Sequence, residues 1–212
     1  MEIIPSAIRD YITAHCAPPD DVLSELDAET RANAPDLQSS HYEGELCRML
    51  ALMVGAREAV CVGTFTGYTT LCLTRGMPAD GHVVACEISA EWSAIAEKYW
   101  AKAGVADLID MHVGSANDML ATMSTEPVID LVYIGADKPN APHYYEQLLQ
   151  RMRPGGVMII GDVLRSARLS EEQPDDQDAV VMRELNSRIA ADERVDSVIL
   201  TVPHGATLIR KR

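Results

Sequence analysis

The sequence has 212 residues, of which 47% are apolar and 24% are charged, and its formal net charge is −14 at pH 7. This length suits one substantial hydrophobic core, and no Pro-, Gly- or Ser-rich linker divides the chain, so we expect a single domain over residues 1–212. The acidic balance argues against a protein that grips a nucleic-acid backbone or an anionic membrane surface, because both tasks need clustered Lys and Arg. We therefore expect a small-molecule substrate or a protein partner.

The N-terminal region predicts two helices, over residues 5–16 and 20–32, because its apolar residues recur at helical spacing. Asp20 or Asp21 caps the second helix, after two prolines. Within residues 1–34 these helices are expected to form a lid or a dimer contact. The 5 cysteines are widely spaced without a C-x-x-C pair, and neither a leader segment nor a long apolar run is visible. This pattern favours a reduced, cytoplasmic protein with no membrane span.

From residue 42 onwards, helices alternate with apolar strands. Helices are predicted over 42–54, 68–77, 90–104, 115–123, 141–152 and 178–191, and strands over 58–62, 82–88, 108–113, 128–134, 156–162, 196–202 and 205–211. Alternation of this kind is typical of parallel βαβ units, whereas the short link between the last two strands requires a hairpin. The expected fold is α/β: a doubly wound, mostly parallel sheet of about seven strands with a C-terminal antiparallel hairpin.

One polar, acidic segment, residues 170–179, interrupts this pattern. Its composition predicts a solvated surface loop. The alternative is a gate over the active site, because loops often carry function.

The stretch "VCVGTFTGYTTL" lies where the first strand meets its helix, which in an open α/β sheet is the crevice that binds ligands. Gly63 and Gly67 let the backbone turn tightly and approach a ligand, while Thr64, Thr66 and Thr69 add hydroxyl groups. The G-x-x-x-G spacing lacks the third glycine of the dinucleotide fingerprint, and no Gly-Lys-Ser/Thr follows as in a Walker A loop. By itself, a tight turn without a ligand is an equally good interpretation.

An acidic residue ends the second strand. Glu87 closes the apolar run "VVACE", where a carboxylate can accept hydrogen bonds from both hydroxyls of a ribose; the alternative is an exposed strand-end carboxylate. Gly114, Ser115 and Ala116 close the third strand with small residues that suit the edge of an adenine. These positions together predict a nucleoside cofactor without a diphosphate.

Six blocks carry a family resemblance: "VGTFTGYTT", "CEISAEW", "GVADLIDMHVGSA", "DLVYIGADKPN", "RMRPGGVMIIGDVL" and "RIAADERVDSVIL". In order and in spacing, over roughly residues 35–212, they resemble the caffeoyl-CoA and catechol O-methyltransferase family, class I enzymes that depend on S-adenosyl-L-methionine (SAM). The resemblance implies a Rossmann-like methyltransferase fold, SAM as cofactor, a small-molecule acceptor and a homodimer.

The resemblance also implies which residues bind the cofactor. The loop after the first strand would surround the methionine part of SAM, Glu87 would bind the ribose, Ser115 and Ala116 the adenine, and Ser39 the carboxylate end. The full implied set is Ser39, Gly63, Thr64, Phe65, Tyr68, Thr69, Glu87, Ile88, Ser115, Ala116 and Gly135. Cys61 departs from a glutamate that the family commonly has at the end of this strand.

The substrate half departs further from the family. Family members hold a divalent cation with the first Asp of an Asp-Ala-Asp-Lys segment and with a later Asp-Asn pair, and this cation binds both oxygens of a catechol. Those three places read Gly135, Gly161 and Asp162 here. Mg²⁺ needs carboxylate charge to offset its dehydration, so we expect no divalent metal, with Asp162 the only retained ligand position.

Three other residues could rebuild a metal site: Asp137, His41 and His143. Each also has a structural interpretation. Asp137 would be a helix N-cap, His41 a loop residue before the next helix, and His143 a surface residue of a first helical turn.

Methyl transfer from a sulfonium is an in-line displacement, so the protein must align the acceptor and make its hydroxyl more anionic. Lys138 is retained and can serve as a base or stabilise a phenolate, or it is a turn residue paired with Asp137. Asp162 and His41 are the next catalytic candidates. We therefore predict a metal-independent O-methyltransferase for a phenolic or hydroxyl acceptor.

Other functions stay open. The acceptor can be a nitrogen or a carboxylate; the chain can be a SAM-binding enzyme of another type, such as a cyclase or lyase that uses the positive charge of SAM; or it can be a catalytically silent SAM-binding protein. The retained cofactor loop and Lys138 favour an enzyme.

Overall fold

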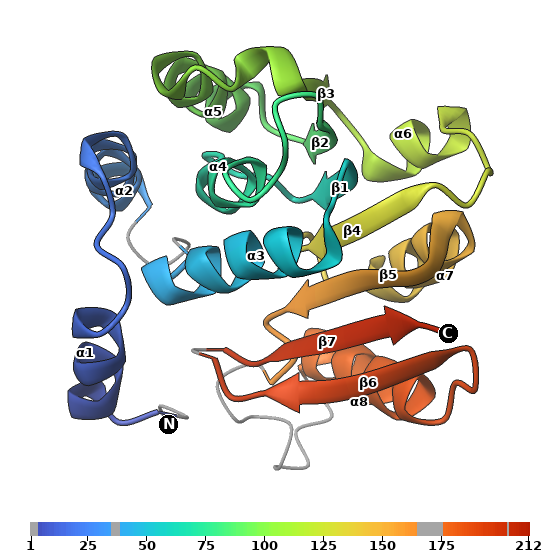
Figure 1. Ribbon diagram of the computed structural model, residues 1–212. Helices are drawn as coiled ribbons and strands as arrows, with labels where there is room; N and C mark the ends of the chain where they lie inside the picture. Colours follow the sequence, from blue (N-terminus) through green and yellow to red (C-terminus); the bar gives the residue numbers. More distant parts are fainter. Residues whose placement is uncertain (1–3, 35–38, 165–175, 203) are drawn as a thin grey trace.

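The computed structural model describes residues 4–34, 39–164, 176–202 and 204–212. Within these residues a seven-stranded sheet runs through the molecule in the order β3-β2-β1-β4-β5-β7-β6 (Figure 1). Its strands are β1 (Glu58–Val62), β2 (His82–Glu87), β3 (Ile109–Val113), β4 (Ile129–Ile134), β5 (Met152–Gly161), β6 (Val195–Leu200) and β7 (Ala206–Lys211).

The strand directions define the class of fold. β1 pairs in parallel with β2 and β4, β2 with β3, and β4 with β5, whereas β7 pairs antiparallel with both β5 and β6. The predicted seven-stranded α/β fold with a C-terminal antiparallel hairpin is confirmed. Because parallel strands end at one edge of the sheet, the residues that follow β1, β2, β4 and β5 meet there.

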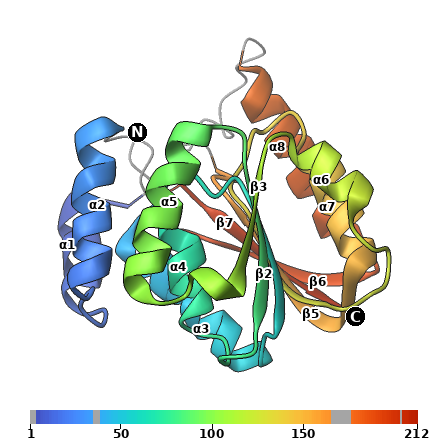
Figure 2. The same ribbon diagram turned by 90° about the horizontal axis from the view of Figure 1, so that it is seen from above.

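Helices cover both faces of the sheet (Figure 2). One face carries α3 (His41–Val54), α4 (Tyr68–Thr74) and α5 (Ala90–Ala103), with α1 (Ser6–Ala14) and α2 (Asp21–Asn33) on the same side; a short 3₁₀ helix, η1 (Ala106–Leu108), follows α5. The other face carries α6 (Ala116–Thr122), α7 (Ala141–Arg151) and α8 (Gln177–Ala190).

Each face of the sheet has its own apolar core, and β4 contributes to both. Successive side chains of a strand point to opposite faces. Tyr133 therefore packs with Cys47 and Cys61 in the core under α3, whereas Ile134 packs in the core under α7. This alternation directs the phenol of Tyr133 toward α3 at the edge where the parallel strands end.

The two N-terminal helices differ in how they are attached. α2 buries Leu23 and Leu26, and Asp20 caps it by accepting a hydrogen bond from Leu23 N at 2.9 Å, as predicted. Glu29 of α2 also accepts hydrogen bonds from Tyr99 and Lys98 of α5, both at 2.6 Å. α1 buries no side chain. α2 thus belongs to the packed body, and α1 is the element left with an open face.

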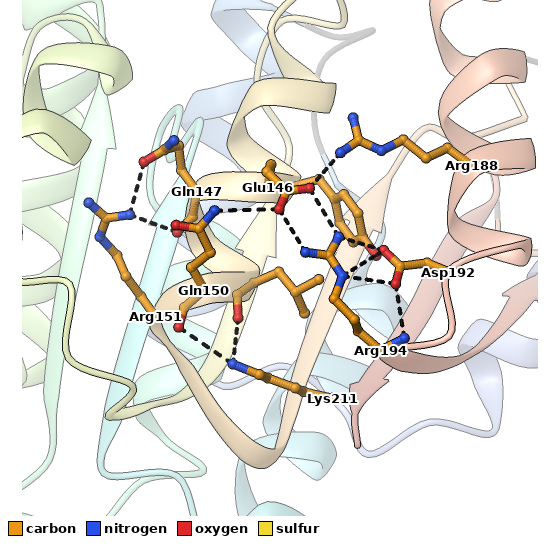
Figure 3. Close-up of polar contacts among 10 residues, drawn as sticks. Glu146, Gln147, Gln150, Arg151, Arg188, Asp192, Arg194 and Lys211 are labelled. Carbon is orange, nitrogen blue, oxygen red and sulfur yellow. Dashed lines mark hydrogen bonds and ion pairs between the residues drawn. The ribbon is translucent and has the colours of Figure 1, made fainter.

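Charged side chains fasten the end of α7 to the C-terminal strands (Figure 3). Arg194, just before β6, pairs with Glu146 of α7 at 2.7 Å and with Asp192 at 2.6 Å. Lys211 of β7 donates to Leu149 O at 2.9 Å, a carbonyl at the helix end that lacks an intrahelical partner. This cluster lies at the amino end of β5, so it supports the sheet away from the edge where the parallel strands end.

Some boundaries differ from the prediction. β5 starts at Met152, ahead of the predicted 156, and stops at Gly161, so Asp162 lies outside the strand with a left-handed φ of 57°. Of the predicted loop over 170–179, residues 170–175 lie outside the described residues. From Gln177 onwards the chain forms α8. Among the described helices, none has both the length and the apolar content that a membrane span needs.

Candidate active site

The loop after β1 needs glycine at two positions. Gly63 has φ 81°, and a Cβ there would lie 2.5 Å from Ala136 N, in the loop after β4. Gly67 has φ 87°, and a Cβ there would lie 2.7 Å from the indole nitrogen of Trp100, which donates to Gly67 O at 3.1 Å. Any side chain at these positions would push the loop away from its neighbours. The tight turn predicted from "GTFTG" is therefore also a close contact with the loop after β4.

The hydroxyl groups of this loop have different partners. Thr66 accepts from Thr30 of α2 at 2.8 Å, and Thr69 donates to Ser39 at 3.2 Å. The hydroxyl of Thr64 is buried, with no hydrogen-bond partner in the described part of the chain. A buried hydroxyl without a partner is costly, so this loop has a polar group that suits a ligand.

The carboxylate of Glu87 is held by backbone N–H groups. Its two oxygens accept from Phe65 N at 2.7 Å and from Ser89 N at 3.0 Å. Phe65 has φ 52° and packs its ring on Trp92, with ring centroids 4.8 Å apart. The side chain is thus fixed across the space between the loops after β1 and β2, where its free lone pairs can accept from a pair of ribose hydroxyls.

A pocket of about 430 Å³ opens at this edge of the sheet. Of the residues predicted to bind the cofactor, it is lined by Gly63, Phe65, Glu87, Ile88, Ser115, Ala116 and Gly135. Ile88 is 78% exposed, so its apolar side chain offers an uncovered surface to a flat ring. The lining does not include Ser39, Thr64, Tyr68 and Thr69.

Sequence reasoning missed Asn140 and Tyr144, which also line the pocket. Tyr144 donates to Asp137 at 2.8 Å, and Asn140 donates to the other oxygen of Asp137 at 2.6 Å. The N-cap of α7 is Asn140, so the interpretation of Asp137 as the helix N-cap is wrong. Asp137 instead orders the pocket wall. The signal in the sequence is the spacing of Asp137, Asn140 and Tyr144, one helical turn apart from one to the next.

His41 bonds through both ring nitrogens. Nε2 lies 2.6 Å from Ala17 O and Nδ1 lies 2.8 Å from the hydroxyl of Tyr68. A carbonyl only accepts, so Nε2 carries the proton and Nδ1 accepts from Tyr68, whose pKa is raised by burial. His41 is the first residue of α3 rather than a loop residue, and it connects the N-terminal segment to the cofactor loop. His143 is exposed in the first turn of α7, which confirms its surface interpretation.

The phenol of Tyr133 packs beside Gly135 and Gly161, at the ends of β4 and β5. A Cβ on Gly135 would lie 2.8 Å from Cε1 of Tyr133, and a Cβ on Gly161 would lie 3.2 Å from its hydroxyl oxygen. The first distance is shorter than real Cβ contacts, and the second is tight. Both glycines therefore face the same tyrosine side chain.

Lys138 and Asp162 form an ion pair at this end. Lys138 is 7% exposed, and its ammonium donates to Asp162 at 3.1 Å, to Ala136 O at 3.2 Å and to Gly161 O at 3.5 Å. An ammonium has three N–H donors, so all of them have acceptors. The lysine thereby joins the loop after β4 to the end of β5.

Glu43 is a further charged group near Tyr133, and sequence reasoning missed it. It lies in the first turn of α3 and accepts from the hydroxyl of Tyr133 at 3.2 Å. Burial raises its pKa to about 7, with a further contribution from Asp162, while Tyr133 and Lys138 act in the opposite direction. The available signal is its place four residues before the buried Cys47, which puts a carboxylate on the core-facing side of a helix.

The residues at this end do not fit the divalent cation of the resembling family. Among the described residues, no group of three or more His, Cys, Asp and Glu side chains is placed to hold a metal ion. Asp162 is the one family ligand position that keeps a carboxylate, and this carboxylate pairs with Lys138. The ring of Tyr133 occupies the space beside Gly135. A dication needs several oxygen donors in regular geometry, which this arrangement does not supply.

The pocket lies between Glu87 and the small residues after β3, at the edge where the parallel strands of a seven-stranded sheet end. This combination defines a class I, SAM-dependent methyltransferase. Residues 13–212 match the family model described as O-methyltransferase, and the chain belongs to that family.

Individual relatives agree with this assignment. Tricin synthase 1 of Oryza sativa is 37% identical over 82% of this chain and 75% of the relative, and probable caffeoyl-CoA O-methyltransferase 2 of Dictyostelium discoideum is 32% identical over 97% and 92%. Among solved structures, the O-methyltransferase TomG of Streptomyces achromogenes in complex with SAM has a TM-score of 0.87 at 29% identity, covering 97% of this chain and 96% of that one. The predicted family and cofactor are confirmed.

Proposed function

We propose that the chain methylates the hydroxyl of a small phenolic acceptor without a metal ion. The observation that carries this proposal is the 2.8 Å distance between Tyr133 Cε1 and a Cβ on Gly135, because any side chain at this family ligand position would meet the tyrosine ring. The names of the relatives motivate the acceptor class, since they include caffeoyl-CoA and catechol O-methyltransferases.

SAM supplies a methyl group that its sulfonium already activates, so the protein must orient the acceptor oxygen in line with the bond that breaks. Lys138 and Asp162 assist by fixing the loop after β4 and the end of β5 around the acceptor. We assign His41 a supporting role through Tyr68, because both of its ring nitrogens are already bonded.

The proposed cofactor contacts follow the pocket. Glu87 binds the ribose hydroxyls, Ile88 packs on the adenine, and Ser115 and Ala116 contact its edge. Ser39, Tyr68 and Thr69 fix the loop around the methionine part of SAM through their hydrogen bonds, and the hydroxyl of Thr64 is left to bind the ligand.

The test is turnover in a chelator. The purified protein is incubated with SAM and a panel of phenols, amines and carboxylates, with EDTA or with Mg²⁺, and S-adenosylhomocysteine is measured. Equal formation of S-adenosylhomocysteine and a methyl ether in both conditions supports the proposal. Activity that appears only with Mg²⁺ would refute metal independence, and S-adenosylhomocysteine formed only with amines or carboxylates would refute the acceptor class.

We further propose a homodimer that uses α1. This helix buries none of its residues, and its apolar side chains Ile8 and Tyr11, 53% and 62% exposed, lie one turn apart. Sedimentation of the intact protein and of an I8E/Y11E variant tests this; a wild-type monomer would refute it. The 5 free thiols suit a reducing compartment, and we propose the cytoplasm.

A further inference from the structure

Two polar side chains meet beside Gly161 at the end of β5. Glu43 comes from the first turn of α3 and Tyr133 from β4. Tyr133 donates to Glu43 Oε1 at 3.2 Å, and a Cβ on Gly161 would lie 3.6 Å from that same oxygen. The carboxylate therefore stands on the side of Gly161 that a side chain would otherwise fill. The next residue, Asp162, is part of the pocket wall.

The hydrogen bonds show which charged group still has free acceptor capacity. All donors of Lys138 have acceptors, and Asp162 is its ion-pair partner. Among the described residues, Glu43 has one side-chain hydrogen-bond partner, Tyr133, and part of its surface stays exposed. A carboxylate can accept about four hydrogen bonds. Glu43 thus has free acceptor capacity at the place where the other charges are already paired.

We propose that Glu43 binds the acceptor hydroxyl and takes its proton, while Tyr133 holds the carboxylate in position. This proposal rests on the O-methyl transfer proposed above. The hydroxyl proton moves to the carboxylate of Glu43, and the oxygen attacks the methyl carbon of SAM. The bond between that carbon and sulfur breaks, and its electron pair stays on sulfur. The products are a methyl ether, neutral S-adenosylhomocysteine and a protonated Glu43, so charge and atoms balance.

The arrangement also narrows the substrate class. A metal-bound catechol presents two neighbouring oxygens to the cation, whereas one carboxylate receives one hydroxyl. Lys138 and Asp162 pair with each other, so neither is left unpaired to bind a second oxygen of the substrate. A phenol with a single hydroxyl is therefore expected to react as fast as the matching catechol.

Three variants distinguish a base from a purely structural role of Glu43: Glu43→Gln, Tyr133→Phe and Glu45→Gln. Glu45 is the matched control, because it lies on the same helix and pairs with Arg48 at 2.9 Å. For each variant, S-adenosylhomocysteine affinity is measured by calorimetry, and kcat and KM are measured with a phenol and with the matching catechol. Calorimetric binding of the phenol to the S-adenosylhomocysteine complex gives a readout that does not depend on turnover.

We expect Glu43→Gln to bind S-adenosylhomocysteine like the wild type, to bind the phenol more weakly, and to lose about 10²–10⁴-fold in kcat, the usual contribution of a positioned base. Glu45→Gln is expected to match the wild type. If Glu43→Gln binds the phenol and turns it over as well as Glu45→Gln does, the proposal is overturned. If the wild type binds the phenol through Glu43 but forms no methyl ether, the proposed transfer fails while the binding role stands. A wild type that binds no phenol overturns both roles of Glu43.

Discussion

The ring of Tyr133 takes the space that a side chain at position 135 would need, because Tyr133 Cε1 lies 2.8 Å from the position of a Cβ on Gly135. Gly161 faces the same side chain less tightly, at 3.2 Å from the hydroxyl. Both glycines thus face one tyrosine, and a side chain would have less room at Gly135 than at Gly161.

This difference in clearance predicts which of two substitutions destabilises the protein more. Gly135→Ala is expected to lower the free energy of unfolding by about 1–3 kcal/mol, as overpacking in a core does, because the ring is buried and cannot move freely. Gly161→Ala is the matched control, with a smaller loss. Urea denaturation of the two variants measures this, and a larger loss for Gly161→Ala would contradict the geometry.

The hydrogen bonds of His41 predict an effect on cofactor binding. His41→Ala frees the hydroxyl of Tyr68 and Ala17 O, and the loss of a hydrogen bond is worth about 1 kcal/mol, so S-adenosylhomocysteine affinity should fall about fivefold or more. At saturating SAM, kcat should stay close to that of the wild type. His143→Ala, at an exposed position, is the control. A large loss of kcat with unchanged affinity would instead make His41 a catalytic residue.

The surroundings of Glu43 predict a pH dependence. Its pKa is about 7, so the carboxylate becomes protonated as pH falls below that value, and turnover falls with it. The facing groups are Tyr133 of β4, Lys138 after β4 and Asp162 after β5. Tyr133→Phe removes a hydrogen bond that favours the ionised carboxylate, which raises the pKa of Glu43 and moves the acidic limb of kcat to higher pH. Tyr145→Phe, which loses a bond to Asp192 instead, should leave that limb in place.

The cluster around Arg194 predicts how stability depends on acid. Hydrogen bonds from Arg194 lower the pKa of Asp192 and of Glu146 below their usual values. The unfolded chain, with carboxyl pKa values of about 4, then binds more protons than the folded one, so this stabilisation is complete above about pH 5 and is lost as pH falls through the lowered values.

Arg194→Gln removes these hydrogen bonds, so its free energy of unfolding should change less between about pH 5 and pH 2 than that of the wild type. The control is Arg31→Gln, because Arg31 forms an exposed pair with Asp27 one turn away. Urea midpoints measured across the pH range test this prediction. If the midpoints of Arg194→Gln and of the wild type change equally with pH, the hydrogen bonds of Arg194 are not the cause.

Much of the fold follows from the sequence because the strands are continuous apolar runs that alternate with helices. The end of β5 was harder to predict: "GVMIIGD" reads as one strand, yet Asp162 turns out of it with φ 57°. A left-handed backbone at a non-glycine residue depends on tertiary contacts, here the ion pair with Lys138.

Most of the residues predicted on the cofactor side line the pocket, since its glycines and Glu87 lie close to where the backbone turns. The contacts around Tyr133 were not predictable. Glu43 and Tyr133 are far apart in sequence, and each has an ordinary place in a helix or strand. Only the packing of α3 on β4 shows that their polar atoms meet, and that the glycines at 135 and 161 belong to the same arrangement.

The close approach of Gly63 to Ala136 limits how this enzyme can change its substrate. Because the loops after β1 and β4 touch, a residue that widens one loop displaces the other, and an altered acceptor pocket would disturb the hold on SAM. Engineering or evolution toward new acceptors therefore has to change both loops together.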